Sequence, residues 1–248
     1  MNNTKLNKSK EEISVALLSP EVNESTVINQ VTVEKVKELS AKTILYLLSK
    51  RLIDIFLSLI FLVLCSPIFL TIFLLIKIKE PKHNVFFSQN RYGLNGKRFR
   101  MYKFRSMVAN AEQKLICNKV LYEKYINNNY KLEAHEDPRI TKLGVFIRKY
   151  SIDEIPQFYN VLKGDMSIVG PRPIVDEELE NEYGLDKIKF LSTKPGITGY
   201  WQANGRSSVG YPARKNMELY YIDNCSLILD FKIILLTIKS VVFKTGAY

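Results

Sequence analysis

The chain has 248 residues, 46 % of them hydrophobic, which is enough to bury the core of one domain and excludes a disordered tail or a fibrous repeat. Three cysteines, odd in number and far apart, argue against a disulfide scaffold and a cysteine-rich zinc module. With 36 basic and 25 acidic residues the net charge is +11, which indicates an anionic partner: nucleic acid, a phosphate-bearing substrate or an anionic membrane.

Residues 1–45 carry equal numbers of lysines and glutamates, and the first 30 residues are polar without the apolar stretch of a signal peptide. We expect a polar, flexible N-terminal extension over 1–45. A helical pattern begins near Val31 and continues through Leu48.

The segment from Ile55 to Ile76 contains no formal charge and is long enough, as a helix, to cross the ~30 Å hydrocarbon layer. Pro67, beside Ser66, predicts a kink near its middle. Lysine and arginine flank both ends, and the positive-inside rule places such flanks in the cytoplasm. We therefore predict a re-entrant membrane helix over 46–80. A straight membrane-spanning helix with a tolerated proline is the alternative, and a soluble core helix is the least favoured.

Residues 77–149 hold 17 basic and six acidic residues and follow the apolar segment directly. This position favours a membrane surface or a phosphate ligand over a diffuse nucleic-acid coat. Strand-like runs lie at 85–87 and 99–104, with a helical run at 109–125. Residues 227–243 suit an amphipathic helix at the membrane surface and suit a core-facing helix equally well. We expect a mainly helical α/β fold with a small catalytic domain over 81–248.

Basic and aromatic residues alternate between 91 and 105 in a pattern that could grip nucleic acid, face lipid phosphates or form a solvated cationic strand. The basic members are Arg91, Lys97, Arg98, Arg100, Lys103 and Arg105. A Gly-rich segment, 194–206, allows close backbone approach to a phosphate or sugar but is more typical of a structural turn. The acidic run 176–182 is typical of a solvated helix face. His83 and His135 are isolated, which argues against a histidine-based site.

The densest group of chemically active residue types is R-K-Y-S-I-D-E-I-P-Q, from Arg148 to Gln157. Ser151 and Glu154 match a helix capping box, which by itself explains their spacing. Adjacent acids behind a basic residue also suit Mg²⁺-assisted phosphoryl chemistry, with Arg148 binding a phosphate. From the spacing, both interpretations stay open.

The ordered motifs resemble the bacterial sugar transferases, the monotopic polyprenyl-phosphate phosphoglycosyl transferases, over residues 50–248. The motifs in chain order are K-R-L-I-D-I with the Ser66-Pro67 break, K-F-R-S-M, D-P-R-I-T-K-L-G, R-K-Y-S-I-D-E-I-P-Q, G-D-M-S-I-V-G-P-R-P, K-P-G-I-T-G-Y-W-Q-A-N-G-R and S-L-I-L-D-F-K-I-I-L-L-T. Each motif is modest, but the ordered set is specific.

The resemblance implies transfer of a phosphosugar from a UDP-sugar to undecaprenyl phosphate, with release of UMP and with Mg²⁺, as the first membrane step of exopolysaccharide, capsule or glycan synthesis. Asp153 would be the nucleophile that forms an aspartyl-phosphosugar intermediate, and Glu154 a metal ligand or acid–base group; both are candidate metal ligands. The expected substrate-binding residues are Arg148, Pro171, Arg172, Pro173, Lys103, Arg105 and Arg206.

The resemblance also implies an enzyme at the cytoplasmic face of the bacterial inner membrane, with both ends of the Ser66-Pro67 helix in the cytoplasm. Expected partners are the UDP-sugar, undecaprenyl phosphate and anionic membrane lipids, with a homodimer as a candidate assembly and no nucleic acid. Glu218 stands where the family usually carries Asp, and the transferred sugar stays undetermined. The competing hypothesis is a non-enzymatic, membrane-anchored basic adaptor that binds anionic lipid or nucleic acid.

Overall fold

The computed structural model describes residues 24–128, 132, 136–205 and 209–242 and divides the chain into two compact units, Met1–Lys50 and Arg51–Tyr248. Helix α2 (Glu24–Leu64) begins in the first unit, at Glu24 rather than near Val31. Residues 24–45 are therefore helical, although they belong to the stretch predicted as a flexible extension. Residues 24–45 contain neither glycine nor proline, the residues that disfavour a helix most.

The apolar segment is divided into two helices at Cys65. Helix α2 ends at Leu64, and α3 (Ser66–Lys79) begins with Pro67 in its first turn, where the missing backbone N–H costs least. Within the described residues no single helix has the length and apolarity of a membrane span, but Thr43–Leu64 and α3 meet that requirement together, with a bend of 61° between them. The break is where the Ser66-Pro67 pair predicted it.

Within the second unit, two charged side chains near the start of the apolar segment bind backbone groups that lie much later in the chain. Arg51 donates from Nη1 to the carbonyl oxygen of Val161 (2.6 Å) and from Nη2 to that of Leu162 (2.8 Å). Asp54, which is buried, accepts a hydrogen bond from the N–H of Ile168 at 3.0 Å. These bonds fix the beginning of the apolar segment against the domain that follows it.

The sheet content is small and consists of two separate pairs of strands. Strands β1 (Phe86–Tyr92) and β2 (Arg98–Phe104) form an antiparallel hairpin in which Phe86 faces Phe104. Strands β3 (Ser167–Val169) and β4 (Gly196–Thr198) pair in parallel. Gly196 and Gly199 of the 194–206 segment pack against backbone here: a Cβ on Gly196 would lie 2.1 Å from the backbone nitrogen of Gly170. Their small size therefore serves the packing of β3 and β4.

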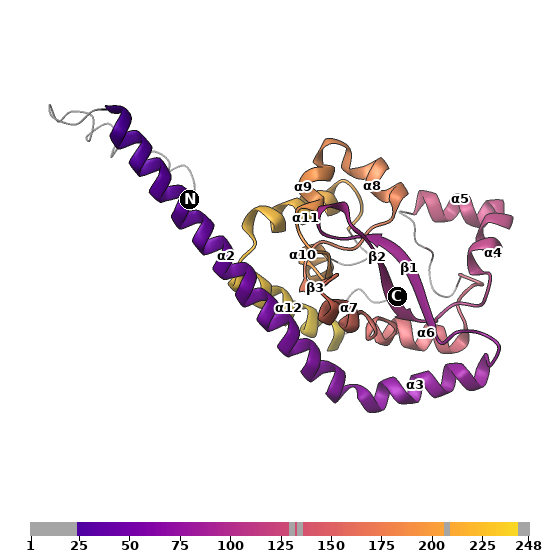
Figure 1. Ribbon diagram of the computed structural model, residues 1–248. Coiled ribbons are helices and arrows are strands. Elements are labelled where there is room, and N and C mark those ends of the chain that lie inside the picture. Colours follow the sequence, from indigo (N-terminus) through magenta and orange to yellow (C-terminus); the bar gives the residue numbers. More distant parts are fainter. Residues whose placement is uncertain (1–23, 129–131, 133–135, 206–208, 243–248) are drawn as a thin grey trace. The chain divides into compact units, whose positions relative to one another are not determined.

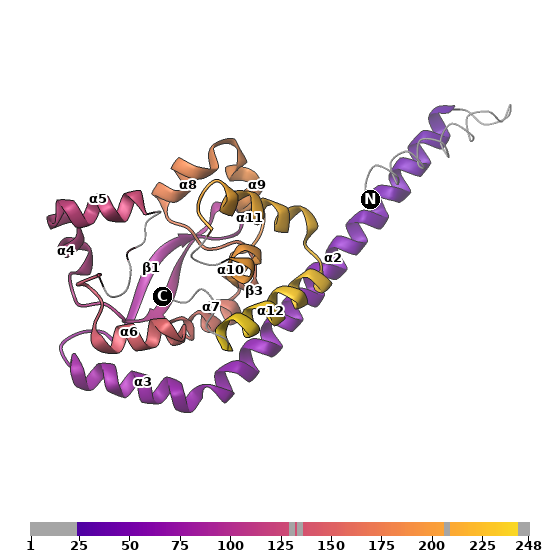
Figure 2. The same ribbon diagram turned by 180° about the vertical axis from the view of Figure 1, so that it is seen from behind.

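Helices supply most of the remaining structure (Figures 1 and 2). The helical run predicted at 109–125 forms two helices, α4 (Ala111–Cys117) and α5 (Lys119–Asn127), because Asn118 leaves the helical conformation and caps α5 through its side chain. The other elements are α6 (Lys142–Lys149), the 3-10 turn η2 (Ile152–Glu154), α7 (Gln157–Lys163), α8 (Asp176–Tyr183), η3 (Gly184–Asp186), α9 (Lys187–Leu191), α10 (Tyr200–Asn204), α11 (Ala213–Asn224) and α12 (Leu227–Val242), with η1 (Leu94–Gly96) in the hairpin loop. The prediction of a mainly helical α/β chain is confirmed.

Two hydrophobic clusters hold the site in place. Helices α3 and α6 lie next to each other (Figures 1 and 2), and Ile72 and Ile76 belong to the same buried cluster as Ile147. The second cluster joins β2, α7, β3 and α12 through residues such as Met101 and Ile233. Helix α12 therefore does face the core. Its other side exposes large apolar residues: Ile228, Phe231, Leu235 and Ile238.

Candidate active site

The adjacent acids Asp153 and Glu154 lie in η2, between α6 and α7. The capping-box interpretation of this segment is wrong. Ser151 has a φ of 55° and its side chain makes no capping hydrogen bond. Glu154 does not turn back toward Ser151, because its carboxylate binds Lys103 instead. The spacing of Ser151 and Glu154 thus does not reflect a capping box at the start of a helix. The capping function does not account for either acid.

Among the described residues, Lys103, near the end of β2, is the cation that forms ion pairs with the two acids. Its Nζ lies 2.7 Å from Oε1 of Glu154 and 4.0 Å from Oδ2 of Asp153. The buried Asn160 of α7 holds β2 in place: it accepts the N–H of Tyr102 at 3.0 Å and donates to the carbonyl oxygen of Arg100 at 2.7 Å. Asn160 therefore positions Lys103 against the acids.

The two carboxyl groups have pKa values displaced in opposite directions. Burial raises the pKa of Asp153 to about 6, against the opposing effect of the Lys103 ammonium. Burial also acts to raise the pKa of Glu154, but Lys103 outweighs it and holds that pKa below its usual value. A pair with separated pKa values can divide two roles at one site. Glu154 is the firmly ionised partner, and Asp153 changes protonation near neutral pH.

The expected substrate-binding residues are only partly brought together. Arg148 is exposed, and its positive charge lowers the pKa of Asp153; Arg172 is half-buried and lowers that of Glu154. Pro171 and Pro173 are held through their carbonyl oxygens, which accept hydrogen bonds from Gly196 N (2.8 Å) and Arg91 Nη1 (3.3 Å).

Two further expected residues stand apart from this group. Arg105 does not contact the acids and lines a separate cavity beside α3. Arg206 lies outside the described residues.

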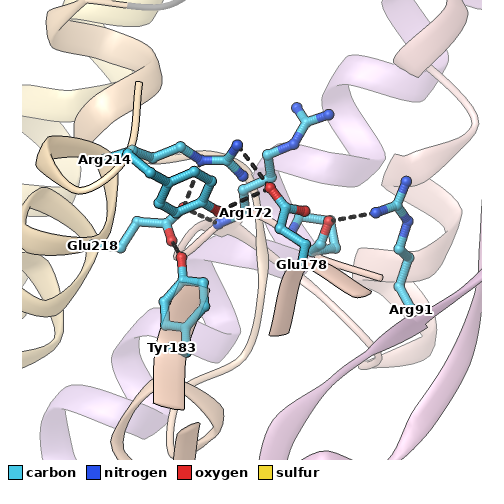
Figure 3. Close-up of polar contacts among 8 residues, drawn as sticks. Arg91, Arg172, Glu178, Tyr183, Arg214 and Glu218 are labelled. Atoms are coloured by element: carbon cyan, nitrogen blue, oxygen red, sulfur yellow. Dashed lines mark hydrogen bonds and ion pairs between the residues drawn. The ribbon is translucent and has the colours of Figure 1, made fainter. Parts of the chain in front are cut away.

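A second group of charged residues, buried and not anticipated from the sequence, supports Arg172. Figure 3 shows Arg214 reaching Glu178, and Tyr183 pointing at Glu218. Nη1 of Arg214 lies 2.8 Å from Oε1 of Glu178, and Nε lies 4.0 Å from Oε1 of Glu218. Glu218 also accepts hydrogen bonds from the hydroxyl of Tyr183 and from the backbone N–H of Arg172, the latter at 3.1 Å. Glu218 thus fixes the backbone at Arg172.

These partners correct two interpretations of the sequence. The acidic run 176–182 is not wholly a solvated face, because Glu178 is buried against Arg214. The spacing of Arg214 and Glu218, one helical turn apart, was the signal available for the pair. Nothing local indicated Tyr183 or Glu178.

The basic and aromatic alternation of β2 does not form a stacking surface for bases. Phe99 and Phe104 are buried in the core. Arg98 pairs with Asp176 at 2.8 Å on the surface, and Arg91 is largely withdrawn from solvent. Burial, together with the nearby charge of Arg172, lowers the pKa of Arg91 to about 10. Phe99 and Phe104 lie on opposite faces of β2 and are buried in two different hydrophobic clusters, so neither ring is available to stack on a base.

The acids suit a magnesium ion that is shared with a substrate. Within the described residues no group of three or more His, Cys, Asp or Glu side chains is placed to hold a metal. Mg²⁺ commonly takes only one or two carboxylates and completes its shell with water and substrate phosphates. Asp153 and Glu154 supply that number of oxygen ligands, so the donor set fits Mg²⁺ bound together with a diphosphate.

Comparison with known proteins gives a consistent result. The family described as bacterial sugar transferase matches residues 45–244. Galactosyl transferase CpsE of Streptococcus agalactiae is 47 % identical over 203 residues, which cover 82 % of this chain and 44 % of that protein. Undecaprenyl-phosphate galactose phosphotransferase of Salmonella typhimurium is 44 % identical over 202 residues, covering 80 % and 41 %.

A shorter relative is covered more fully. The exopolysaccharide production protein ExoY of Sinorhizobium fredii is 38 % identical over 205 residues, which cover 81 % of this chain and 88 % of that protein. The chain therefore spans less than half of the first two relatives and most of the third.

Proposed function

The chain belongs to the bacterial sugar transferase family, and from that premise we propose that it moves a phosphosugar from a UDP-sugar to undecaprenyl phosphate and releases UMP. The relatives support this proposal, since one is named for galactose phosphate transfer to undecaprenyl phosphate and another for N-acetylgalactosamine phosphate transfer. The product would be the first lipid-linked sugar of an exopolysaccharide, a capsule or a glycan.

The observation that carries the proposal is the environment of Asp153. Its carboxyl group is buried, lies 4.0 Å from the Lys103 ammonium and feels the charge of Arg148. A nucleophile that must approach a negatively charged phosphate needs cations to offset the repulsion. A buried carboxylate has also lost part of its hydration shell before it attacks. Asp153 is both buried and close to cations, so it meets both requirements.

The reaction would proceed in two displacements. In the first, a carboxylate oxygen of Asp153 forms a bond to the sugar-bearing phosphorus, the diphosphate P–O bond breaks, and UMP leaves with that electron pair. In the second, an oxygen of the lipid phosphate attacks the same phosphorus and the bond to Asp153 breaks, which restores the carboxylate. The two substrates thus use one site in turn.

The surrounding side chains would hold and neutralise the phosphates. Lys103 and Arg148 would face the phosphate that is attacked, while Arg172, fixed through Glu218, would bind the nucleotide part beside Pro171. Mg²⁺, when bound through Asp153 or Glu154, would supply further charge neutralisation. Glu154 stays ionised beside Lys103 and would orient that ammonium group.

We also propose that the bent helix pair enters and leaves the membrane by the cytoplasmic face. Helix α3 is apolar, ends in Lys77 and Lys79, and exposes large apolar side chains such as Leu70 and Ile78. The exposed side of α12 would lie in the headgroup region, where anionic lipids meet the basic stretch 77–149. Soluble proteins rarely expose apolar patches of this kind without a partner.

The test is UMP release by membranes that contain the full chain, supplied with undecaprenyl phosphate, Mg²⁺ and a panel of UDP-sugars. We expect release with at least one donor and a loss of about 10³-fold or more in Asp153→Asn. Asp223→Asn, an exposed acid paired with Lys189, is the matched control and should keep wild-type activity. A basic adaptor predicts no UMP release with any donor, and full activity in Asp153→Asn would refute the mechanism.

A further inference from the structure

A cavity of about 220 Å³ lies between the end of α3 and the beginning of α6, apart from the two acids of the active site. Ile76 and Leu143 form apolar parts of its wall. Four charged residues also line it: Lys79, Glu80, Arg105 and Lys142. Three cations and one acid give the cavity an excess of positive charge, which favours an anion.

Two polar atoms of this lining are buried without a hydrogen-bond partner in the described part of the chain. They are Nε of Arg105, a donor, and Oε2 of Glu80, an acceptor. Buried polar groups in folded proteins are almost always hydrogen-bonded, to protein, water or ligand. The two side chains carry opposite charges, but no ion pair joins them within the described residues. Both side chains line the cavity, and each keeps one polar atom that the described protein surroundings leave unbonded.

We propose that this cavity binds the headgroup of a membrane phospholipid that carries a hydrogen-bond donor beside its phosphate, as ethanolamine and glycerol headgroups do. The phosphodiester would accept from Arg105 and face the charges of Lys79 and Lys142. The ammonium or hydroxyl of the headgroup would donate to Glu80. Ile76 and Leu143 would contact the adjoining carbon atoms.

The position of the cavity fits a lipid better than a soluble anion. It lies at the C-terminal end of α3, whose other side exposes Leu74, Leu75 and Ile78. With that side in the hydrocarbon layer, Lys79 and Glu80 are placed at headgroup depth. The inference thus rests on the proposed membrane location, although not on the proposed reaction.

The same phosphate chemistry is offered by the lipid acceptor and by free phosphate, but their only hydrogen-bond donor is a P–OH group, which the three cations of the cavity disfavour because they stabilise the dianion. A polyprenyl phosphate and inorganic phosphate at neutral pH carry no ammonium or alcohol group beside the phosphate. Binding either one as the fully ionised phosphate would leave the carboxylate of Glu80 without a donor next to a second negative charge, which is costly. A headgroup with its own donor satisfies both side chains.

The experiment measures lipid retention by the full-length protein, without any sugar nucleotide. Purified protein is exchanged into mixed micelles with equal amounts of phosphatidylethanolamine, phosphatidylglycerol and phosphatidylcholine, and bound lipid is quantified by native mass spectrometry. We expect the first two lipids to be retained about tenfold over phosphatidylcholine, whose quaternary ammonium has no N–H to donate. This ratio corresponds to roughly one charge-assisted hydrogen bond.

Two variants separate the two halves of the site. Glu80→Gln should keep phospholipid binding but lose most of the preference over phosphatidylcholine, and Arg105→Gln should lose retention of all three lipids. The matched controls remove the same charges from exposed positions: Glu112→Gln and Lys82→Gln should both retain the wild-type pattern. Thermal unfolding of each variant shows whether lipid binding is lost from a protein that is still folded. If Arg105→Gln does not fold, Arg105→Lys takes its place.

Three results would overturn the inference. They are equal retention of the three lipids by the wild type, the same change in Glu112→Gln as in Glu80→Gln, and stoichiometric displacement of the lipid by undecaprenyl phosphate or inorganic phosphate. UMP release is measured separately on the same preparations. Absence of UMP release by the wild type would refute the proposed reaction without affecting the lipid-binding result. Failure of the proposed reaction and failure of the proposed lipid site can therefore be told apart.

Discussion

Two groups of acids and cations in this protein use the same residue types for different ends. At the active site, Asp153 and Glu154 share Lys103, and their side chains are 11 % and 29 % exposed. In the buried group, Glu178 and Glu218 share Arg214 and are 9 % and 1 % exposed.

The difference lies in how completely each carboxylate is satisfied. Glu218 has partners in Tyr183, the backbone of Arg172 and the charge of Arg214. Asp153 has a backbone hydrogen bond and the Lys103 ammonium at 4.0 Å, the limit of an ion pair. A fully bonded carboxylate holds its neighbours in place, whereas an incompletely bonded one keeps an oxygen free for metal or phosphorus. The comparison teaches that Asp153 differs from Glu218 in how completely its carboxylate is bonded, which is the property that the proposed role of Asp153 requires.

The largest effect expected from this comparison concerns stability. Arg214→Met leaves Glu178 and Glu218 buried without their shared cation, and it removes the guanidinium from the ring of Trp201, 4.4 Å away. Breaking such a buried pair costs about 3–5 kcal/mol of unfolding free energy. Thermal and denaturant unfolding in detergent would measure it. Arg98→Met, which removes an exposed pair with Asp176, should stay close to wild type; equal losses in the two variants would remove the distinction between the groups.

The next effect concerns rate rather than stability. Lys103→Met removes the ammonium that faces both acids of the dyad, so the pKa values of Asp153 and Glu154 should both rise. We expect UMP release at pH 7 to fall by about 10²-fold, with little change in unfolding temperature. The acid limb of the pH profile should also move to higher pH. A large loss of stability with an unmoved pH profile would instead mean that Lys103 acts as Glu218 does, as a structural support.

The smallest effect is the pH dependence of the wild-type protein. Burial raises the pKa of Asp153 to about 6, and attack requires the ionised carboxylate. Activity should therefore be at its plateau above about pH 7 and fall as the pH decreases through 6, to about one tenth at pH 5. The kcat/KM for UMP release, measured against pH, tests this. A profile that stays flat down to pH 4.5 would assign Asp153 an ordinary pKa and weaken the contrast with the buried group.

Much of the architecture could be predicted from local pattern, and much of the site could not. The break at Ser66-Pro67, the helix over residues 227–243 and the strand at 99–104 follow from composition and periodicity within a few residues, whereas the pattern left open whether that helix faces the core or the membrane surface. The capping box at Ser151 was wrong because the pattern S-x-x-E describes a possible local bond, and a distant lysine competes for Glu154. Its Nζ comes from 51 positions away in the chain.

The sequence by itself determined the uncharged 22-residue segment, the excess of positive charge after it, and the ordered motifs that the family match confirmed. The tertiary structure alone decided which acids share a cation, that Arg105 leaves the active site for a cavity beside α3, and that Glu178 is buried. The physical reason is the separation along the chain between the residues that interact. Helix breaks and strand patterns depend on neighbours along the chain, whereas the partner of a buried charge is chosen only when distant segments pack together and exclude water.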